Sequence, residues 1–277
     1  MSIGLPLLGE LLGTFILILL GCGVNASNSF KKMFAKNSGG NWVLIAFGWA
    51  FGVMCGVLVA NAFNSGAHLN PAVTLFVTLS DLSKESVKSN IGTHIGAALL
   101  YIVMQFIGAI LAASLLVFIN WKHVIENDAA VLKSTLSTGP SHPKAHVQNF
   151  AYELVGTLVL VGVILAFSKG ANAGHSVLMN AEEGIVKVSY GGISHLGPLP
   201  VTFLVAAIGM SLGSVTGYAI NPARDLGPRL VYFATSKIFP KKINNIVSAD
   251  FKYGLINAGL APALSGLIIG GIALAIS

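Results

Sequence analysis

Six apolar stretches, each about as long as a bilayer requires, constrain this chain more than any other feature. A helix that crosses about 30 Å of hydrocarbon needs about 20 apolar residues. The six stretches run from Leu5 to Val24, Trp42 to Ala62, Thr93 to Ile119, Ala151 to Ser168, Leu199 to Thr216 and Gly254 to Ile276. Apolar residues make up 54% of the 277 and charged residues only 9%, so polar surface cannot cover the apolar side chains. We expect an all-α membrane protein with six transmembrane helices.

Charge and cysteine content add little to this picture. The net charge of +6 does not indicate nucleic-acid binding, because most lysines lie in the segments between the stretches, beside lipid headgroups. Cys22 and Cys55 fall inside apolar stretches, where they are expected to be small buried residues rather than a disulfide pair. No Lys or Arg precedes the first stretch, so we do not read it as a cleaved signal peptide.

The chain contains an internal repeat. The first stretch begins "GELLGTFILILLG" and the fourth begins "YELVGTLVLVGVI", which aligns Glu10 with Glu153. An Asn-Pro-Ala tripeptide then follows the second stretch and again the fifth. Three stretches per repeat place the second repeat in the opposite orientation, as in inverted repeats that form pathways at the bilayer midplane. We expect one domain over residues 1–277, with repeats at approximately 1–120 and 149–277.

The two tripeptides predict two short helices. Asparagine is a preferred N-cap, and proline is tolerated at the first helical position. The apolar run 72–80 and the run 223–233 that follow them are too short to cross a bilayer at about 1.5 Å per residue. We therefore expect two re-entrant half-helices. The tripeptides that begin them are Asn70, Pro71 and Ala72, and Asn221, Pro222 and Ala223.

The segments before the tripeptides would then lie at membrane depth without helical hydrogen bonds. Such backbone is tolerated only where it is buried in protein or lines a water-filled cavity. We expect it to line a pore, with the two asparagines donating hydrogen bonds at its centre. The candidate lining residues are Gly66, Ala67, His68, Leu69, Ala219 and Ile220.

With these motifs the chain resembles the major intrinsic protein family, the aquaporins and aquaglyceroporins. The resemblance covers the whole length and includes "SGAHLNPAVT", "NPARDLGP" and the repeated "E-L-x-G-T". It implies an aquaporin-like fold and a homotetramer in which each subunit has its own pore. It also implies a multi-pass protein of the plasma membrane with both termini in the cytoplasm.

The lysines disagree with that orientation. The family topology leaves four lysines inside and ten outside, which is the reverse of the positive-inside rule. The four are Lys84, Lys88, Lys169 and Lys187; the ten are Lys31, Lys32, Lys36, Lys122, Lys133, Lys144, Lys237, Lys241, Lys242 and Lys252. We follow the resemblance, because it covers the whole fold.

The resemblance also implies a selectivity filter. Arg224 would offer several donors to a passing hydroxyl and repel cations, although a salt bridge with Asp225 is the simpler alternative. Gly209 stands where water-selective relatives carry histidine, which would widen the pore. Tyr218 stands where glycerol-conducting members carry an aromatic.

The second stretch should contribute an aromatic residue to the filter, but an alignment shift of one residue decides which one it is. Phe51 is favoured, because it aligns with the aromatic-glycine pair of the family, and Trp49 is the alternative. The stretch from Lys169 to Leu196 is long for a connection and carries no recognisable chemistry.

Glu10 and Glu153 are the acidic residues well inside full apolar stretches. They could be helix-end carboxylates exposed to water, or a proton relay. A third role fits the expected geometry better, in which each carboxylate accepts backbone N–H groups from the neighbouring re-entrant loop. We take both residues as loop-supporting.

Together these features predict a passive channel for glycerol and other small uncharged solutes, with water, that excludes ions and protons. Dihydroxyacetone, urea, lactic acid and hydrogen peroxide are further plausible solutes. The alternatives are a mainly water-selective aquaporin and a proton-coupled secondary transporter. No nucleophile and base pairing, metal-ligand spacing or phosphate loop is evident, so we expect no enzyme activity, no metal site and no cofactor.

Overall fold

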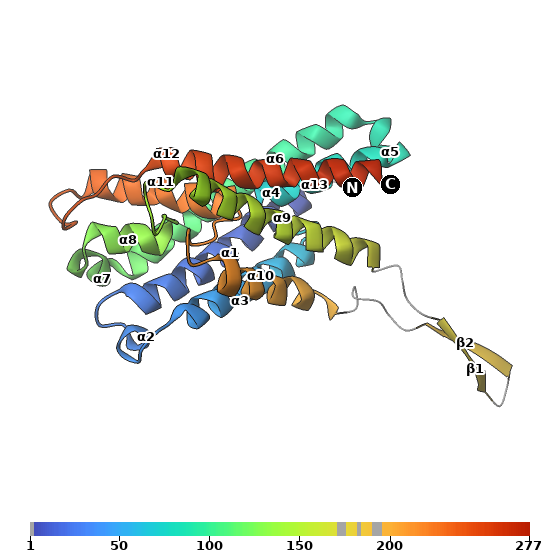
Figure 1. Ribbon diagram of the computed structural model, residues 1–277, viewed down its shortest axis with the longest axis horizontal. Coiled ribbons are helices and arrows are strands. Elements are labelled where there is room, and N and C mark those ends of the chain that lie inside the picture. Colours follow the sequence, from blue (N-terminus) through green and yellow to red (C-terminus); the bar gives the residue numbers. More distant parts are fainter. Residues whose placement is uncertain (1–2, 171–175, 182–183, 190–195) are drawn as a thin grey trace.

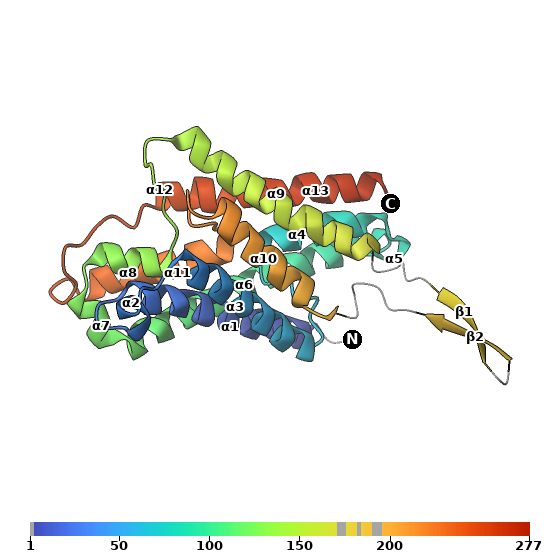
Figure 2. The ribbon, with the colours of Figure 1, turned by 60° about the horizontal axis from the view of Figure 1, so that its bottom comes forward.

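The computed structural model describes residues 3–170, 176–181, 184–189 and 196–277. Figure 1 shows a bundle of long helices lying roughly along one axis, with the start of α1 (Gly4–Ser29) and the end of α13 (Ala261–Ala275) at the same end of the bundle. The other bundle helices are α3 (Trp42–Ala62), α6 (Ile91–Ile119), α9 (His146–Gly170) and α10 (Leu199–Leu212). Figure 2 shows the same bundle from a second side.

Five helices in the described part of the chain are long and apolar enough to cross a membrane. The last of them joins α12 (Phe251–Tyr253), the π-helical stretch η3 (Gly254–Leu260) and α13 into one continuous span, Phe251–Ala275. The expected fifth stretch, 199–216, is only partly helical, because α10 ends at Leu212 after 14 residues. The chain leaves the helix there to form the non-helical segment that leads to Asn221.

Short elements connect the long ones. They are α2 (Phe34–Asn37), η1 (Asp81–Ser83), α5 (Glu85–Lys88), α7 (Trp121–Glu126), α8 (Ala129–Leu136), β1 (Ser176–Ala181) and β2 (Gly184–Ser189). The two strands form an antiparallel hairpin that pairs Ser176 with Ser189, and it projects from the end of the bundle where α1 begins (Figure 1). This hairpin is an addition to the expected all-helical chain, in a segment whose sequence carries no apolar run.

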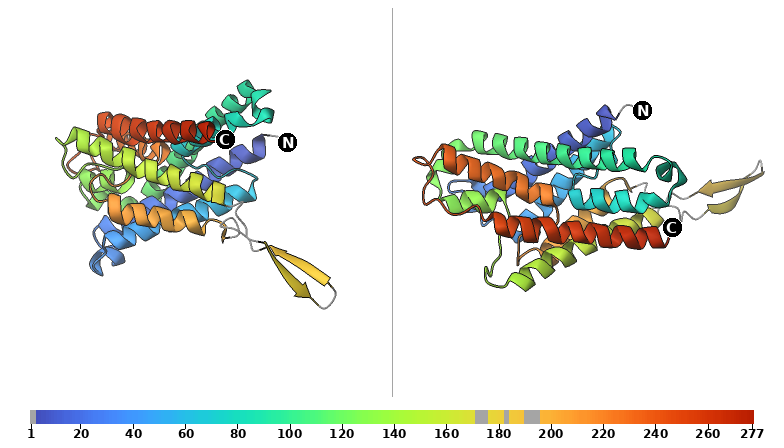
Figure 3. Two further views of the ribbon diagram at one scale, coloured as in Figure 1. Left: turned by 45° about the vertical axis from the view of Figure 1, so that its right-hand side comes forward. Right: turned by 90° about the horizontal axis from the view of Figure 1, so that it is seen from above.

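Both short helices expected after the tripeptides are present. They are α4 (Pro71–Ser80) and α11 (Pro222–Ile238), each with Pro at its first position. The right-hand view of Figure 3 shows the two helices end to end, with α6 on one side and α13 on the other. α11 extends five residues beyond the run that the sequence predicted.

Glycines allow α4 to pack tightly against α13. A Cβ atom added at Gly266 would lie 2.2 Å from the carbonyl oxygen of Ala72. A similar close approach occurs between α6 and α1, where a Cβ at Gly108 would lie 2.3 Å from the carbonyl oxygen of Leu11. Small residues at such crossings let backbones approach closely, which is a main source of helix association in membranes.

We expect Gly266→Ala to destabilise the protein by about 1 to 3 kcal/mol, because the added methyl group overlaps α4. Gly271→Ala is the matched control, since it lies on the same helix and a Cβ there would meet nothing within 4 Å. Thermal unfolding in detergent should show a lower Tm for Gly266→Ala and an unchanged or higher Tm for Gly271→Ala. Equal Tm values for the two variants would contradict the packing described here.

Candidate functional site

The two tripeptide asparagines join the tips of α4 and α11. The Asn70 side-chain oxygen accepts a hydrogen bond from the Ala72 N–H at 2.9 Å, and its amide donates to the Ile220 carbonyl at 2.9 Å. Asn221 does the same in reverse, accepting from the Ala223 N–H at 3.0 Å and donating to the Leu69 carbonyl at 2.8 Å. Each asparagine therefore caps its own helix and holds the loop that precedes the other helix.

The loops before the tips adopt backbone conformations that are unusual for residues with a side chain. Ala67, Leu69, Tyr218 and Ile220 have φ values of 51°, 51°, 38° and 42°. Such left-handed residues cost of order 1 to 3 kcal/mol each and persist only where surrounding contacts hold them. The loops therefore need partners that replace the missing helical hydrogen bonds.

Two fully buried glutamates supply these partners. The Glu10 carboxylate accepts from the N–H groups of His68 at 2.9 Å and Leu69 at 2.8 Å. The Glu153 carboxylate accepts from the N–H groups of Ala219 and Ile220, both at 2.9 Å. The contacts are equivalent in the two repeats, because each carboxylate accepts from the second left-handed residue of its loop and from the residue just before it.

Two cavities meet beside the joined tips. The inner cavity, of about 580 Å³, opens toward the end of the bundle that carries the termini. The outer cavity, of about 570 Å³, opens toward α8 and the chain that follows it. Trp49, Tyr218 and Arg224 line both cavities and therefore separate them. The inner cavity is also lined by Gly66, Ala67, His68, Leu69, Asn70, Ala219, Ile220 and Asn221, so every expected lining residue reaches it. Pro71, Ala72, Pro222 and Ala223 are buried behind the tips.

The residues that separate the cavities form a narrow set of contacts. The Arg224 guanidinium carbon lies 4.0 Å from the centre of the Trp49 ring and 5.8 Å from that of Tyr218. One guanidinium nitrogen donates to the Gly217 carbonyl at 3.0 Å. The Trp49 ring N–H donates to Asn25 at 3.1 Å. The guanidinium thus stacks on the Trp49 ring, with the Tyr218 ring further away, at the place where the two cavities meet.

The structure resolves the ambiguity in the second stretch against the favoured residue. Phe51 is 48% exposed on the outer side of α3, packs against Phe47 with ring centres 5.9 Å apart, and lines neither cavity. Trp49 is buried and lines both. The placement of Phe51 in the filter was wrong, because two residues on an α-helix are about 200° apart and face opposite sides.

Gly209 has a different role from the one expected. A Cβ there would lie 3.0 Å from Cζ of Tyr218, so the space left by the missing side chain holds the tyrosine ring and is not an opening of the cavity. Trp42 fixes this arrangement, since its ring N–H donates to the Gly209 carbonyl at 2.7 Å and its ring meets the edge of Tyr218 at 5.9 Å. The glycine admits the aromatic ring to the passage.

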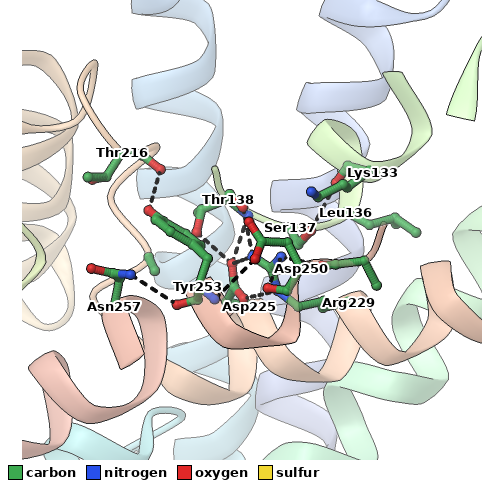
Figure 4. A network of polar contacts seen from close by, with 12 residues as sticks. Lys133, Leu136, Ser137, Thr138, Thr216, Asp225, Arg229, Asp250, Tyr253 and Asn257 are labelled. Atoms are coloured by element: carbon green, nitrogen blue, oxygen red, sulfur yellow. Dashed lines mark hydrogen bonds and ion pairs between the residues drawn. The ribbon is translucent and has the colours of Figure 1, made fainter. Parts of the chain in front are cut away.

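A buried network beside the outer cavity was missed by sequence reasoning. Figure 4 shows Asp225 paired with Arg229, whose Nε lies 2.7 Å from the carboxylate. Among the ion pairs of the described residues, none joins Asp225 to the neighbouring Arg224. Asp225 also accepts from the Thr138 N–H at 2.7 Å, and Arg229 donates to the carbonyls of Thr138 at 2.7 Å and Ala249 at 2.6 Å. The i, i+4 spacing of the pair on a helix was the signal that could have found it.

The network ties three separate segments together at the mouth of the outer cavity. It connects α11, which carries Arg224, to the chain after α8 and to the chain before α12. In the part of the chain that the structure describes, no group of three or more His, Cys, Asp or Glu side chains is arranged to hold a metal ion.

Comparisons with known proteins agree with this architecture. The model of the family described as Major intrinsic protein matches residues 5–250. The chain is 46% identical over 272 residues to a protein of Mycoplasmoides gallisepticum named probable glycerol uptake facilitator protein, covering 98% of this chain and 97% of that one. It is 37% identical to glycerol uptake facilitator protein 3 of Lactiplantibacillus plantarum, covering 97% of this chain and 93% of the relative.

A solved structure supports the fold independently. The X-ray structure of the aquaglyceroporin from Plasmodium falciparum superposes with a TM-score of 0.67 at 22% identity, covering 97% of this chain and 94% of that one. This likeness confirms the predicted aquaporin-like fold.

We expect Asp225→Asn to destabilise the protein by about 3 to 5 kcal/mol, because it leaves the Arg229 cation buried without its counter-charge. Glu126→Gln is the control, since it breaks an exposed pair with Lys32 at 2.9 Å and should leave the Tm unchanged. Thermal unfolding in detergent, followed by tryptophan fluorescence, measures both. An Asp225→Asn variant as stable as the wild type would show that the network does not brace the fold.

Proposed function

The chain belongs to the major intrinsic protein family, and from that premise we propose that it conducts glycerol passively, together with water and other small uncharged solutes. It is a multi-pass membrane channel and not an enzyme. The names of the two bacterial relatives support glycerol as the solute.

The observation that carries the proposal is the pairing of aromatic and cationic groups between the two cavities. Glycerol has a carbon skeleton on one side and three hydroxyls that can turn to the other. Trp49 and Tyr218 offer apolar surface to the carbons, and the guanidinium of Arg224 offers N–H donors to the hydroxyls. A solute that fits both walls can exchange its water hydrogen bonds for those of the protein.

Ion exclusion follows from the joined helix tips. Each helix N-terminus carries about half a positive charge, and the tips of α4 and α11 meet next to the cationic Arg224. Cations and protons entering from either cavity would therefore meet a positive potential. Neutral molecules pay no such penalty.

The remaining site residues have supporting roles in this proposal. Glu10 and Glu153 hold the left-handed loops, so that the carbonyls of those loops accept hydrogen bonds along the pathway. His68 lines the inner cavity while its ring Nδ1 lies 3.3 Å from the Thr74 hydroxyl. We further propose that the whole chain is one channel domain, built from inverted repeats at approximately 1–120 and 149–277.

The two alternatives are less well supported. A mainly water-selective pore would need a narrower passage, whereas Gly209 leaves room for an aromatic ring that glycerol can pack against. A proton-coupled transporter would need a titratable group along the pathway. His68 lines the inner cavity, but its ring Nδ1 is engaged with the Thr74 hydroxyl. Glu10 and Glu153 are buried and accept hydrogen bonds from the loop backbone.

We expect vesicles that contain the protein to shrink and then reswell after a jump in external glycerol, and only to shrink in sucrose. Stopped-flow light scattering measures both. Trp49→Ala should raise the permeability to larger polyols such as sorbitol, because it removes one wall of the passage, while Phe51→Ala should match the wild type. Vesicles as tight to glycerol as bare lipid would contradict the function. If the wild type conducts glycerol but Trp49→Ala and Phe51→Ala change the sorbitol permeability equally, only the assignment of Trp49 to the filter is contradicted.

The proposal extends to assembly and orientation. We propose a homotetramer in the plasma membrane, with a pore in each subunit and both termini in the cytoplasm. Exposed apolar side chains on α1, α3 and α10, among them Leu20, Leu58 and Phe203, provide lipid-facing or intersubunit surface.

We expect a cysteine introduced at Ser277, in a variant that lacks Cys22 and Cys55, to react with an impermeant maleimide only after cells are opened. One introduced at Lys36 should react in intact cells. Labelling in the opposite pattern would mean that the charge distribution, and not the family topology, sets the orientation.

A further inference from the structure

An apolar groove on the outside of the bundle has no part in the proposed pathway. It has a volume of about 740 Å³ and lies between α6 and α11, which run side by side in Figure 3. Its walls include Ile110, Val117, Leu230 and Ala234. Toward the α7 end of the bundle the groove is lined by Phe118, which is 77% exposed, and Ile238, which is 67% exposed.

The residues at the α7 end of the groove are of the types found at a membrane–water boundary. Trp121 lines the groove and packs edge-on against Phe239, with ring centres 4.9 Å apart. Tryptophan is enriched at the level of the lipid headgroups. Lys242 also lines the groove, so a cation is present at the depth where a phosphate would lie.

Lys242 belongs to a group of four exposed lysines that we name the basic rim. Its members are Lys122, Lys237, Lys241 and Lys242. Among the residues that the structure describes, none of the four forms an ion pair. Lys237 instead lies 5.7 Å from the centre of the Phe233 ring.

Carboxylates at this end of the molecule are engaged elsewhere. Glu126 pairs with Lys32, Asp128 accepts from Asn245 at 2.8 Å, and Asp225 is buried against Arg229. Asp250 accepts from the Tyr253 N–H at 3.3 Å. None of the four lysines of the basic rim therefore has a carboxylate within ion-pair distance in the described part of the protein, and a basic cluster beside a bilayer attracts anionic lipid at about 1 kcal/mol per lysine.

We infer that the groove between α6 and α11 binds an anionic glycerophospholipid, with an acyl chain along the apolar walls and the phosphate beside Lys242 and the rest of the basic rim. A zwitterionic lipid fits the walls equally well but carries an ammonium group that the rim repels. The charge of the headgroup thus determines which lipid the site prefers, and the acyl chain contributes binding energy for either lipid. Binding of an anionic lipid would also explain why the four lysines of the basic rim lie on the side that the family topology places outside.

The test uses the purified full-length protein in neutral detergent with phosphatidylglycerol or phosphatidylcholine, and native mass spectrometry to count bound lipid. We expect phosphatidylglycerol to bind more tightly than phosphatidylcholine. Lys242→Gln should weaken phosphatidylglycerol binding about fivefold, which corresponds to about 1 kcal/mol, and should leave phosphatidylcholine unchanged. The double variant Lys84→Gln/Lys88→Gln removes two lysines that are ion-paired at the other end and should bind phosphatidylglycerol as the wild type does.

A second variant separates the acyl chain from the headgroup. Ala234→Trp fills the groove and leaves the basic rim intact, so it should weaken the binding of both lipids. Equal loss of phosphatidylglycerol in Lys242→Gln and the Lys84/Lys88 control would overturn the proposal, as would competition by inorganic phosphate alone. If Ala234→Trp dissociates an oligomer without changing lipid binding, the groove is a contact between copies and the proposal is overturned.

Discussion

The arrangement of this protein depends on two side-chain amides that cross between helix tips. Asn70 holds the carbonyl of Ile220, and Asn221 holds that of Leu69, while each also caps its own helix. Two positive helix ends would otherwise repel each other at the centre of a bilayer. The crossed bonds keep them together and still leave both asparagines on the wall of a cavity.

Buried polar side chains compensate for the helical hydrogen bonds that are lost at this junction. A chain that interrupts its helices at membrane depth leaves backbone N–H groups without partners, and each such group costs of order 1 to 3 kcal/mol. Glu10 and Glu153 satisfy those groups, and Asp225 with Arg229 fastens the outer end of α11 to the chain around it. The few charged residues in the interior therefore stabilise a non-helical backbone and need not carry protons.

Sequence reasoning succeeded where local chemistry decides the structure. Asn-Pro at a helix start and bilayer-length apolar runs are local signals, so both half-helices and the spans they interrupt were predictable. The end of α10 was placed too late, because the expected stretch was continued to Thr216 through the small and polar residues that follow Leu212. The side of α3 that faces the cavities could not be predicted, because apolar residues lie all around this helix. No polar side indicates which of Trp49 and Phe51 points inward. The Asp225–Arg229 network depends on segments distant in sequence, and no pattern within one segment reveals its partners at Thr138 and Ala249.

The figures also show how differently the two ends of the molecule are built. The end with the termini carries the protruding hairpin, and the other end carries α7, α8 and the chain before α12 (Figures 1 and 2). The polar network of Figure 4 lies at this second end, so the outer cavity is held by buried ionic contacts, whereas the inner cavity is walled largely by aliphatic side chains.

The central claim is that the crossed asparagine amides create a passage for neutral solutes that is closed to ions. The most direct measurement is the ratio of glycerol to cation permeability in proteoliposomes for the double variant Asn70→Ala/Asn221→Ala, compared with the wild type. The account predicts that the ratio falls, because the tips separate and water wets the junction. A double variant that reconstitutes with unchanged glycerol flux and unchanged ion exclusion would contradict it.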